Sequence, residues 1–333
     1  MFCGNWESLY MESFKSSELK SILHSKRANL YYLEYCRVMQ KNGRVVYITE
    51  KSKVENYFNI PICNTTVILL GNGTSITQAA ARMLSQAGVL FGFCGGGGTP
   101  LFDGNSIEFL TPQSEYRPPL FVQQWLSFWY EDELRLKAAK QLQHCRLLFI
   151  EKIWSSNRDL AKYGLNFSDE LRITMREYDE QNNNASSITQ LLTNEARFTK
   201  LLYKFTASSL LRSEFTRSRE GDGSDLANSF LDHGNYLAYG LAATVLWVLG
   251  IPHAFALMHG KTRRGALVFD VADLIKDAVV LPWSFICAEQ NYQENDFRKV
   301  LISVFTELKI LDFMFDTVQQ ICLDNSVMET QKL

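Results

Sequence analysis

TPQSEYRPPL, residues 111–120, divides the chain into two parts with different hydrophobic patterns. Its three prolines interrupt any regular period, because proline has no backbone N–H and restricts the residue before it. Strand-like segments precede this stretch, and helix-like segments follow it. The sequence therefore predicts two domains. We place an N-terminal extension at 1–15, a β-rich domain at 16–112, a linker at 113–119 and a helical domain at 120–333.

The segments before the linker are rich in aromatic and β-branched residues, which favour strands. They include ANLYYLEYCRVMQ at 28–40 and GRVVYITE at 43–50. Asn42-Gly43 between them predicts a hairpin, because both residues tolerate positive φ. Residues 61–95 follow a strand, turn, helix, strand pattern, with Gly88 as the stop of the helix.

The segments after the linker have apolar residues three and four positions apart, which is the pattern of amphipathic helices. This pattern predicts one long helix over 121–154 and another over 186–211. Helices are also expected from about 225 to 250 and from 270 onward. The second domain is therefore predicted to be helical almost to its end.

The composition is that of a folded protein without an excess of basic charge. Of 333 residues, 46% are hydrophobic and 21% charged, and the net charge is −2. Any nucleic-acid binding therefore needs a local basic patch. The seven cysteines are scattered and never in Cys-x-x-Cys spacing, which argues against a zinc knuckle or a disulfide framework and fits a reducing cytoplasm.

Residues 234–260 contain no Asp, Glu, Lys or Arg, which raises the question of a membrane span. Pro252 and His253 interrupt this run and leave about 15 apolar residues, whereas a spanning helix needs about 20. We interpret the run as a helix buried in a large core.

Glu195 falls on the apolar stripe of the helix predicted over 186–211. A carboxylate there is costly unless it is paired, hydrogen-bonded or bound to a metal. A buried salt bridge, or a helix that turns outward, is the simpler explanation of this residue taken alone. A solvated run of charges is the simplest interpretation of the opposite face, which carries Arg197, Lys200 and Lys204.

His259 lies just before Gly260, at the end of a predicted strand, IPHAFALMHG at 251–260, and a histidine beside an apolar run can also be an ordinary core residue. Asp270, Asp273 and Asp277 share one helical face, where they repel one another unless cations lie between them. A mixed carboxylate and imidazole set suits Mg²⁺ or Mn²⁺, and the imidazole favours Mn²⁺. Zinc held by His253 and His259 remains an alternative.

Lys261, Arg263 and Arg264 directly follow His259 and Gly260. Cations beside a divalent metal suit a phosphodiester, whose negative charge increases in the transition state. The residues therefore suggest phosphoryl transfer on nucleic acid.

These motifs also resemble a known family, the CRISPR-associated integrases of spacer acquisition, and most closely its type I-F subtype. The resemblance covers about residues 16–320 and rests on the following segments, in chain order: SELKSILHSKRANLYYLEYCRV at 17–38, SITQAAARMLSQAGVLFGFCGGGGTPLF at 75–102, NEARFTK at 194–200, NSFLDHGNYLAYG at 228–240 and MHGKTRRGALVFDVADLIKD at 258–277.

The resemblance implies an N-terminal β-sandwich domain with a helix, used for dimerisation, and an all-helical catalytic domain. It implies Glu195, His259 and Asp273 as metal ligands, with Asp270 as a nearby second carboxylate. Tyr239 matches a tyrosine near the scissile phosphate, although a buried core hydroxyl is an equal alternative. Lys261, Arg263 and Arg264 match positions suited to contacts with the DNA backbone.

The implied activity is a metal-dependent DNA integrase and endonuclease of antiviral defence, with Mg²⁺ or Mn²⁺ as cofactor. Such an enzyme inserts captured foreign DNA into a CRISPR array by 3′-hydroxyl transesterification. The implied partners are double-stranded and branched DNA, a second copy of the chain, and a small ferredoxin-like adaptation subunit, in this subtype fused to the interference helicase-nuclease. A branched-DNA repair nuclease and a non-catalytic DNA-binding scaffold are alternatives.

Overall fold

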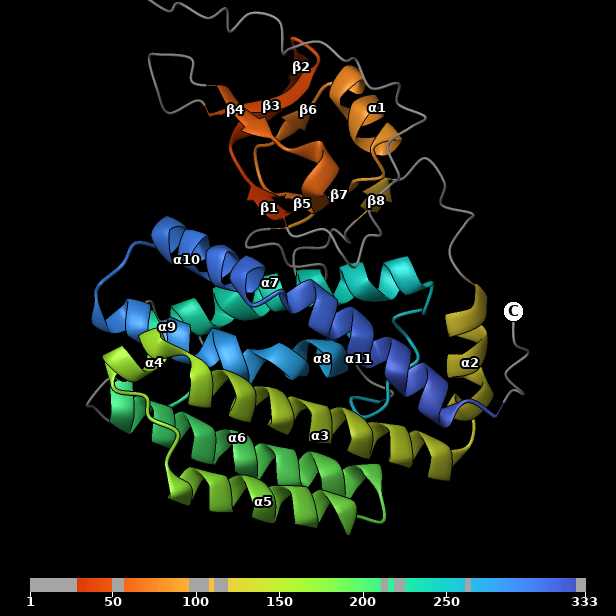
Figure 1. Ribbon diagram of the computed structural model, residues 1–333, viewed down its shortest axis with the longest axis vertical. Coiled ribbons are helices and arrows are strands. Elements are labelled where there is room, and N and C mark those ends of the chain that lie inside the picture. The colour runs from red at the N-terminus through yellow and green to blue at the C-terminus, as the bar shows by residue number, and fades with distance from the viewer. Residues whose placement is uncertain are drawn as a thin grey trace, which may run out of the picture.

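The computed structural model has a β-rich domain above a helical domain in the view of Figure 1. The strands and helix α1 lie within residues 29–110, and all later elements are helices. This arrangement confirms the predicted fold class. The structure describes residues 29–49, 57–95, 108–110, 119–210, 215–218, 225–260 and 265–327.

Two four-stranded sheets make up the β-rich domain. In the first sheet, β1, β5 and β7 are parallel and β8 is antiparallel to β7. In the second, β2, β3 and β4 are antiparallel and β6 is parallel to β2. The strands are β1 (Asn29–Leu33), β2 (Cys36–Lys41), β3 (Arg44–Thr49), β4 (Tyr57–Ile60), β5 (Thr65–Leu70), β6 (Ser75–Ile76), β7 (Leu90–Phe93) and β8 (Glu108–Leu110).

Strand β5 is buried on both faces, as is typical of the central strand of a covered parallel sheet. Ile68 and Leu70 pack in a core with the second sheet and α1 (Gln78–Gln86). Val67 and Leu69 belong instead to the core that continues into the helical domain. The first sheet therefore joins the two domains through its outer face.

The predicted hairpin is confirmed, because Asn42 and Gly43 both have positive φ between β2 and β3. Residues 28–40, which were predicted to favour strands, form two of them, β1 and β2, and these lie in different sheets. Tyr35 between them has a φ of 47°, and its N–H donates to the carbonyl of Asn72. This left-handed residue lets the chain change sheets.

The helical domain contains ten α-helices among the described residues, with one π-helical segment, η4. They are α2 (Pro119–Trp129), α3 (Asp132–Ser156), α4 (Arg158–Tyr163), α5 (Asp169–Asn183), α6 (Ile188–Leu210), α7 (Leu226–Leu249), α8 (Ala266–Ile275), η4 (Lys276–Val280), α9 (Leu281–Glu289), α10 (Glu294–Glu307) and α11 (Ile310–Asn325). In Figure 1, α10 and α7 lie nearest the β-rich domain, and α5 and α6 lie farthest from it.

The helix predicted over 121–154 is divided between α2 and α3, so that prediction is wrong in its continuity. The indole N–H groups of Trp125 and Trp129 donate to the carbonyls of Phe255 and Ala256 at 3.0 and 2.8 Å. These bonds hold α2 against the 251–260 segment, and a turn at Tyr130 and Glu131 separates α2 from α3.

The first part of the apolar run at 234–260 belongs to α7, which ends at Leu249 and is largely buried in the helical domain. The strand predicted at 251–260 is absent there, because these described residues form turns. Among the described helices, none is both long and apolar enough to cross a membrane. The extension at 1–15 and residues 113–118 of the linker lie outside the described residues, and the domain boundaries remain predictions.

Candidate metal centre

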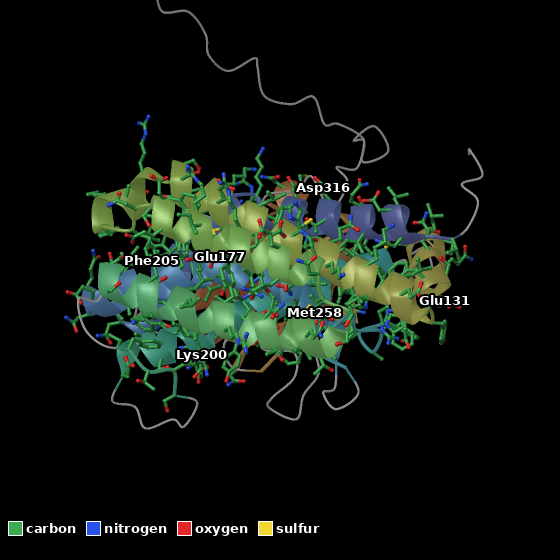
Figure 2. All side chains as sticks on the ribbon, turned by 90° about the horizontal axis from the view of Figure 1, so that it is seen from below. Glu131, Glu177, Lys200, Phe205, Met258 and Asp316 are labelled. Carbon is green, nitrogen blue, oxygen red and sulfur yellow. The ribbon has the colours of Figure 1, made fainter. Side chains whose placement is uncertain are left out.

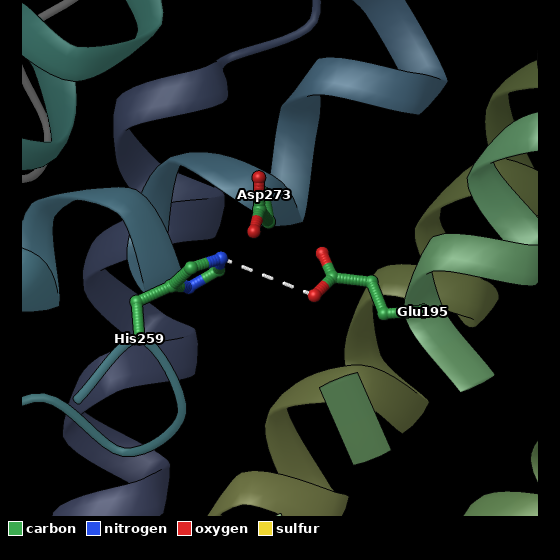
Figure 3. Close-up of side chains that lie close together, drawn as sticks. All are labelled: Glu195, His259 and Asp273. Carbon is green, nitrogen blue, oxygen red and sulfur yellow. Dashed lines mark ion pairs between the residues drawn. The ribbon is translucent and has the colours of Figure 1, made fainter. Parts of the chain in front are cut away.

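Three side chains from distant parts of the chain meet in the helical domain. Glu195 comes from α6, His259 from the 251–260 turns and Asp273 from α8. One ligand atom from each lies within 4.8 Å of the others, and Figure 3 shows the side chains pointing toward one another. Among the described residues, no second group of this kind occurs, so His253 does not join a metal-binding cluster.

Asp270 holds His259 in place from behind. Its carboxylate accepts the backbone N–H groups of Leu257, Met258 and His259 at 2.7, 3.0 and 3.2 Å. It also lies 2.7 Å from Nδ1 of His259, which leaves Nε2 directed at Glu195, 4.0 Å from its Oε2. The Asp270 carboxylate therefore satisfies backbone N–H groups that would otherwise need the carbonyls of a neighbouring strand. It also orients the imidazole of His259.

Glu195 combines two interpretations that the sequence left open. Its Oε1 accepts a hydrogen bond of 3.0 Å from Arg146 on α3, so it is part of a buried salt bridge. Its Oε2 faces His259 and remains available to a cation. Asp273 is similar, because its Oδ1 accepts a 2.6 Å hydrogen bond from Lys276. Each of the three candidate ligands therefore has one atom held by a neighbouring side chain.

The protonation of the candidate ligands is strongly perturbed. Burial, and then the charge of Asp273, raises the pKa of Glu195 to about 7, although Arg146 acts against this rise. Burial favours a lower pKa for His259, but the hydrogen bond to Asp270 and the nearby carboxylates outweigh it and raise the pKa. Burial favours a higher pKa for Asp273, but the nearby cations hold it well below its usual range. Cation binding would therefore displace a proton from Glu195 near neutral pH.

We call the seven charged or titratable residues here the site cluster. They are Arg146, Glu195, His259, Asp270, Asp273, Lys276 and Asp277. Its four carboxylates outnumber its two permanent cations, so with a neutral imidazole and all carboxylates ionised the site cluster carries two negative charges. A divalent cation would neutralise them, and the oxygen-rich donor set with one imidazole fits Mg²⁺ or Mn²⁺.

A cavity of about 650 Å³ opens beside the three candidate ligands. Figure 2 labels two of its lining residues, Lys200 on α6 and Met258. Lys200 is exposed, as predicted, but it also faces the cavity and is not confined to the opposite side of α6. Tyr239 forms part of the wall, where its ring packs edge-on against Phe269 with centroids 4.8 Å apart. Lys261, Arg263 and Arg264 lie outside the described residues.

The sequence predictions missed Arg146 and Lys276. Arg146 lies on the buried stripe of α3, four residues from both Leu142 and Ile150. A charged residue on an apolar stripe is the same signal that identified Glu195, and it would have identified Arg146. Lys276 follows Asp273 by three residues, a spacing at which opposite charges pair on a helix.

Comparison with known proteins adds an independent finding. The family model described as "CRISPR associated protein Cas1" matches residues 30–308. The CRISPR-associated endonuclease Cas1 of Pseudomonas aeruginosa (strain UCBPP-PA14) is 51% identical over 322 residues, covering 95% of this chain and 99% of that protein.

Solved structures agree in fold. A TtCas1–DNA complex matches with a TM-score of 0.64 and 19% identity, over 92% of this chain and 95% of that one. A casposase bound to integration product matches with a TM-score of 0.65 and 11% identity, over 92% of both chains. The family model spans most of the chain and the P. aeruginosa protein matches nearly all of it, so the chain belongs to the Cas1 family of CRISPR-associated proteins.

Proposed function

We propose that this chain is a divalent-metal-dependent DNA endonuclease and integrase, which inserts captured DNA fragments into a CRISPR array by 3′-hydroxyl transesterification. The observation that carries the proposal is the convergence of Glu195, His259 and Asp273 beside a cavity with cations in its wall. The relative named as an endonuclease supports cleavage, and the casposase bound to integration product supports joining. Mg²⁺ or Mn²⁺ is the proposed cofactor.

The proposed reaction exchanges one phosphodiester bond for another. The 3′-oxygen of a fragment bonds to a phosphorus atom of the target strand. The bond between that phosphorus and the 3′-oxygen of the preceding target nucleotide breaks. The attacking hydroxyl loses its proton, and the departing oxygen gains one. Hydrolysis follows the same course with water as the attacking group, which is why one site serves both cleavage and joining.

The chain supplies positioning and charge, on which phosphoryl transfer mainly depends. Glu195, His259 and Asp273 would hold the cation, and the cation would supply charge that polarises a phosphoryl oxygen. Lys200 is exposed and lines the cavity, and we assign it to a phosphate oxygen. We also assign Tyr239, which lines the cavity, to the scissile phosphate as a hydrogen-bond donor.

Partners are proposed from the family resemblance. We propose double-stranded and branched DNA as substrates, with Lys261, Arg263 and Arg264 on the DNA backbone. We propose a homodimer formed through residues 16–112, which binds a small ferredoxin-like adaptation subunit that is fused to the interference helicase-nuclease in type I-F systems. Light scattering of the chain alone and with that subunit tests both associations, and a monomer at micromolar concentration would contradict the dimer.

The test of the function is an assay of branched DNA with Mn²⁺, Mg²⁺ or EDTA, which follows cleavage and strand transfer of a 3′-hydroxyl oligonucleotide. Both activities are expected in either metal, to disappear in EDTA and to disappear in Glu195→Ala. Cleavage without joining, even with the adaptation subunit present, would favour a repair nuclease. DNA binding without turnover under every condition would favour the scaffold.

A further inference from the structure

Arg146 is the most completely enclosed cation of the site cluster, yet it is not one of the candidate metal ligands. A guanidinium has five N–H donors, and here each has an acceptor. Nε and one N–H of Nη2 donate to Oδ2 of Asp277, and the other N–H of Nη2 donates to Thr199. The two N–H groups of Nη1 donate to Gln143 and to Oε1 of Glu195, at 3.1 and 3.0 Å.

This arrangement fixes the orientation of the guanidinium. Asp277 holds one edge through two nitrogens, and Gln143 holds the opposite side from the same helix, α3. Gln143 is itself held, because its Oε1 accepts the hydroxyl of Tyr178 and its Nε2 lies 3.0 Å from the sulfur of Met258. The Nη1 donor that reaches Glu195 therefore has little freedom to move.

Glu195 is constrained by this donor in one respect that matters for metal binding. Because Oε1 is engaged by Arg146, Oε2 is the oxygen that faces Nε2 of His259. Without the guanidinium, the carboxylate could rotate and offer either oxygen, or turn toward another donor. Asp277 completes the arrangement, since its negative charge balances the positive charge of Arg146 so close to a cation site.

We propose that Arg146 and Asp277 form a positioning pair, which presents Oε2 of Glu195 to the metal and thereby sets the affinity of the site. The inference rests on the proposed function, because it assumes a divalent cation at Glu195, His259 and Asp273. Residues that orient metal ligands typically change metal affinity by about 10-fold to 100-fold when they are replaced. The pair would have this effect without touching the metal.

A purely structural role makes a different prediction. If the pair only neutralises buried charge, then removing both charges together should leave the metal affinity unchanged. The variant Arg146→Gln/Asp277→Asn does this, since it keeps the net charge of the site cluster. A matched control is Arg298→Gln/Glu34→Gln, which removes an ion pair between α10 and the β1–β2 turn.

The experiment measures Mn²⁺ binding to the full chain by electron paramagnetic resonance of free Mn²⁺, with circular dichroism to confirm folding. Wild type and the Arg298/Glu34 control are expected to agree within about twofold. Arg146→Gln/Asp277→Asn is expected to bind Mn²⁺ about 10-fold to 100-fold more weakly. An affinity within twofold of wild type in this folded variant would overturn the inference.

A second variant covers the case in which the double variant does not fold. Arg146→Lys keeps the charge, but one ammonium cannot replace a fork that reaches Asp277 and Glu195 through different nitrogens. It is expected to bind Mn²⁺ several-fold more weakly, and unchanged affinity would again overturn the inference. Failure of the proposed function looks different, because the wild type itself would then bind no Mn²⁺, which would reject the metal site and the inference together.

Discussion

Arg146 and Arg298 each join a pair of carboxylates, and they do so in different surroundings. Arg146 joins Glu195 and Asp277 inside the helical domain, with all five of its N–H donors engaged. Arg298 on α10 joins Glu294 of its own helix to Glu34 of the β-rich domain. Its Nε is buried without a hydrogen-bond partner among the described residues.

The difference lies in burial and in charge balance. The Arg146 side chain is 3% exposed and its partners are 13% and 7% exposed, whereas Glu34 and Glu294 are 23% and 45% exposed. We call Glu34, His233, Glu294 and Arg298 the junction cluster, since it joins the two domains and His233 contacts Glu294. Water can help to solvate its charges, whereas the carboxylates of the site cluster are more deeply buried and outnumber its permanent cations by two. A buried excess of negative charge is therefore the feature that distinguishes a metal site from a domain junction.

The largest expected contrast is in stability. Arg146→Met would leave two buried carboxylates without a counter-charge, which typically costs about 3–5 kcal/mol. Arg298→Met removes a partly solvated pair, so a loss of about 1 kcal/mol is expected. Urea denaturation of both variants in EDTA tests the contrast, and equal losses would show that the two clusters do not differ in this way.

Activity should separate the clusters almost as strongly. Asp273→Asn and His259→Ala each remove a candidate ligand, and we expect cleavage of branched DNA in Mn²⁺ to fall by about 10²–10³-fold, the size typical of losing a group that stabilises charge in a transition state. Glu294→Gln changes a carboxylate of the junction cluster and should retain wild-type turnover. Initial rates at saturating DNA provide the measurement. A comparable loss in Glu294→Gln would place the essential carboxylates elsewhere.

The two clusters should also respond to pH with opposite signs when no divalent cation is present. The pKa of Glu195 rises from 4.5 to about 7 on folding, through burial and then Asp273, so its contribution to stability is present below pH 4.5 and is lost as the pH rises through 7. At about 1.36 kcal/mol per pKa unit, this loss is about 3 kcal/mol. His259 adds a contribution of the same sign, since its pKa is also raised. Burial lowers the pKa of His233, which costs stability as the pH falls below 6.5.

Urea denaturation in EDTA at pH 5 and pH 8.5 measures both contributions. Glu195→Gln is expected to reduce the loss of stability at pH 8.5 relative to wild type. His233→Gln is expected to reduce the loss at pH 5. If Glu195→Gln lost as much stability as the wild type between pH 5 and pH 8.5, the raised pKa of Glu195 would be refuted.

The smallest expected effect concerns where DNA binds. Lys200 beside the site cluster is proposed to contact a phosphate, so Lys200→Gln should make the negative slope of log K against log salt shallower by about 1. Lys299 near the junction cluster is paired with Asp296, and Lys299→Gln should leave the slope unchanged. Fluorescence anisotropy of labelled DNA over a series of salt concentrations tests both. An unchanged slope for Lys200→Gln would show that Lys200 contacts no phosphate and faces solvent.

Much of the fold followed from local patterns. The strand, turn, helix, strand order at 61–95 appears as β5, α1 and β7, with the short strand β6 where only a turn was predicted, because period and turn chemistry are local properties. The division of 28–40 between two sheets did not follow, since it depends on Tyr35 contacting Asn72 across the fold. The prediction of a strand at 251–260 was wrong. The N–H groups of Leu257 and Met258 donate to the carboxylate of Asp270, and not to the carbonyls of a neighbouring strand.

The candidate site was also predictable only as far as local sequence patterns reveal it. Glu195 stood out as a carboxylate on an apolar stripe, whereas Asp273 was one of three aspartates on a helical face and was implied as a ligand by the family resemblance. The role of Arg146 could not be read from α3 alone, because its partners lie 49 and 131 residues away in sequence. Only the fold shows which of the charged residues balance one another, and hence that negative charge is left over at Glu195, His259 and Asp273.

That excess of negative charge is the central claim, and calorimetric titration with Mn²⁺ tests it most directly. The wild type is expected to bind one Mn²⁺ per chain, Glu34→Gln in the junction cluster is expected to bind it with the same stoichiometry, and Glu195→Ala is expected to lose the site. One ion bound by Glu195→Ala with wild-type affinity, or none bound by the wild type, would contradict the account.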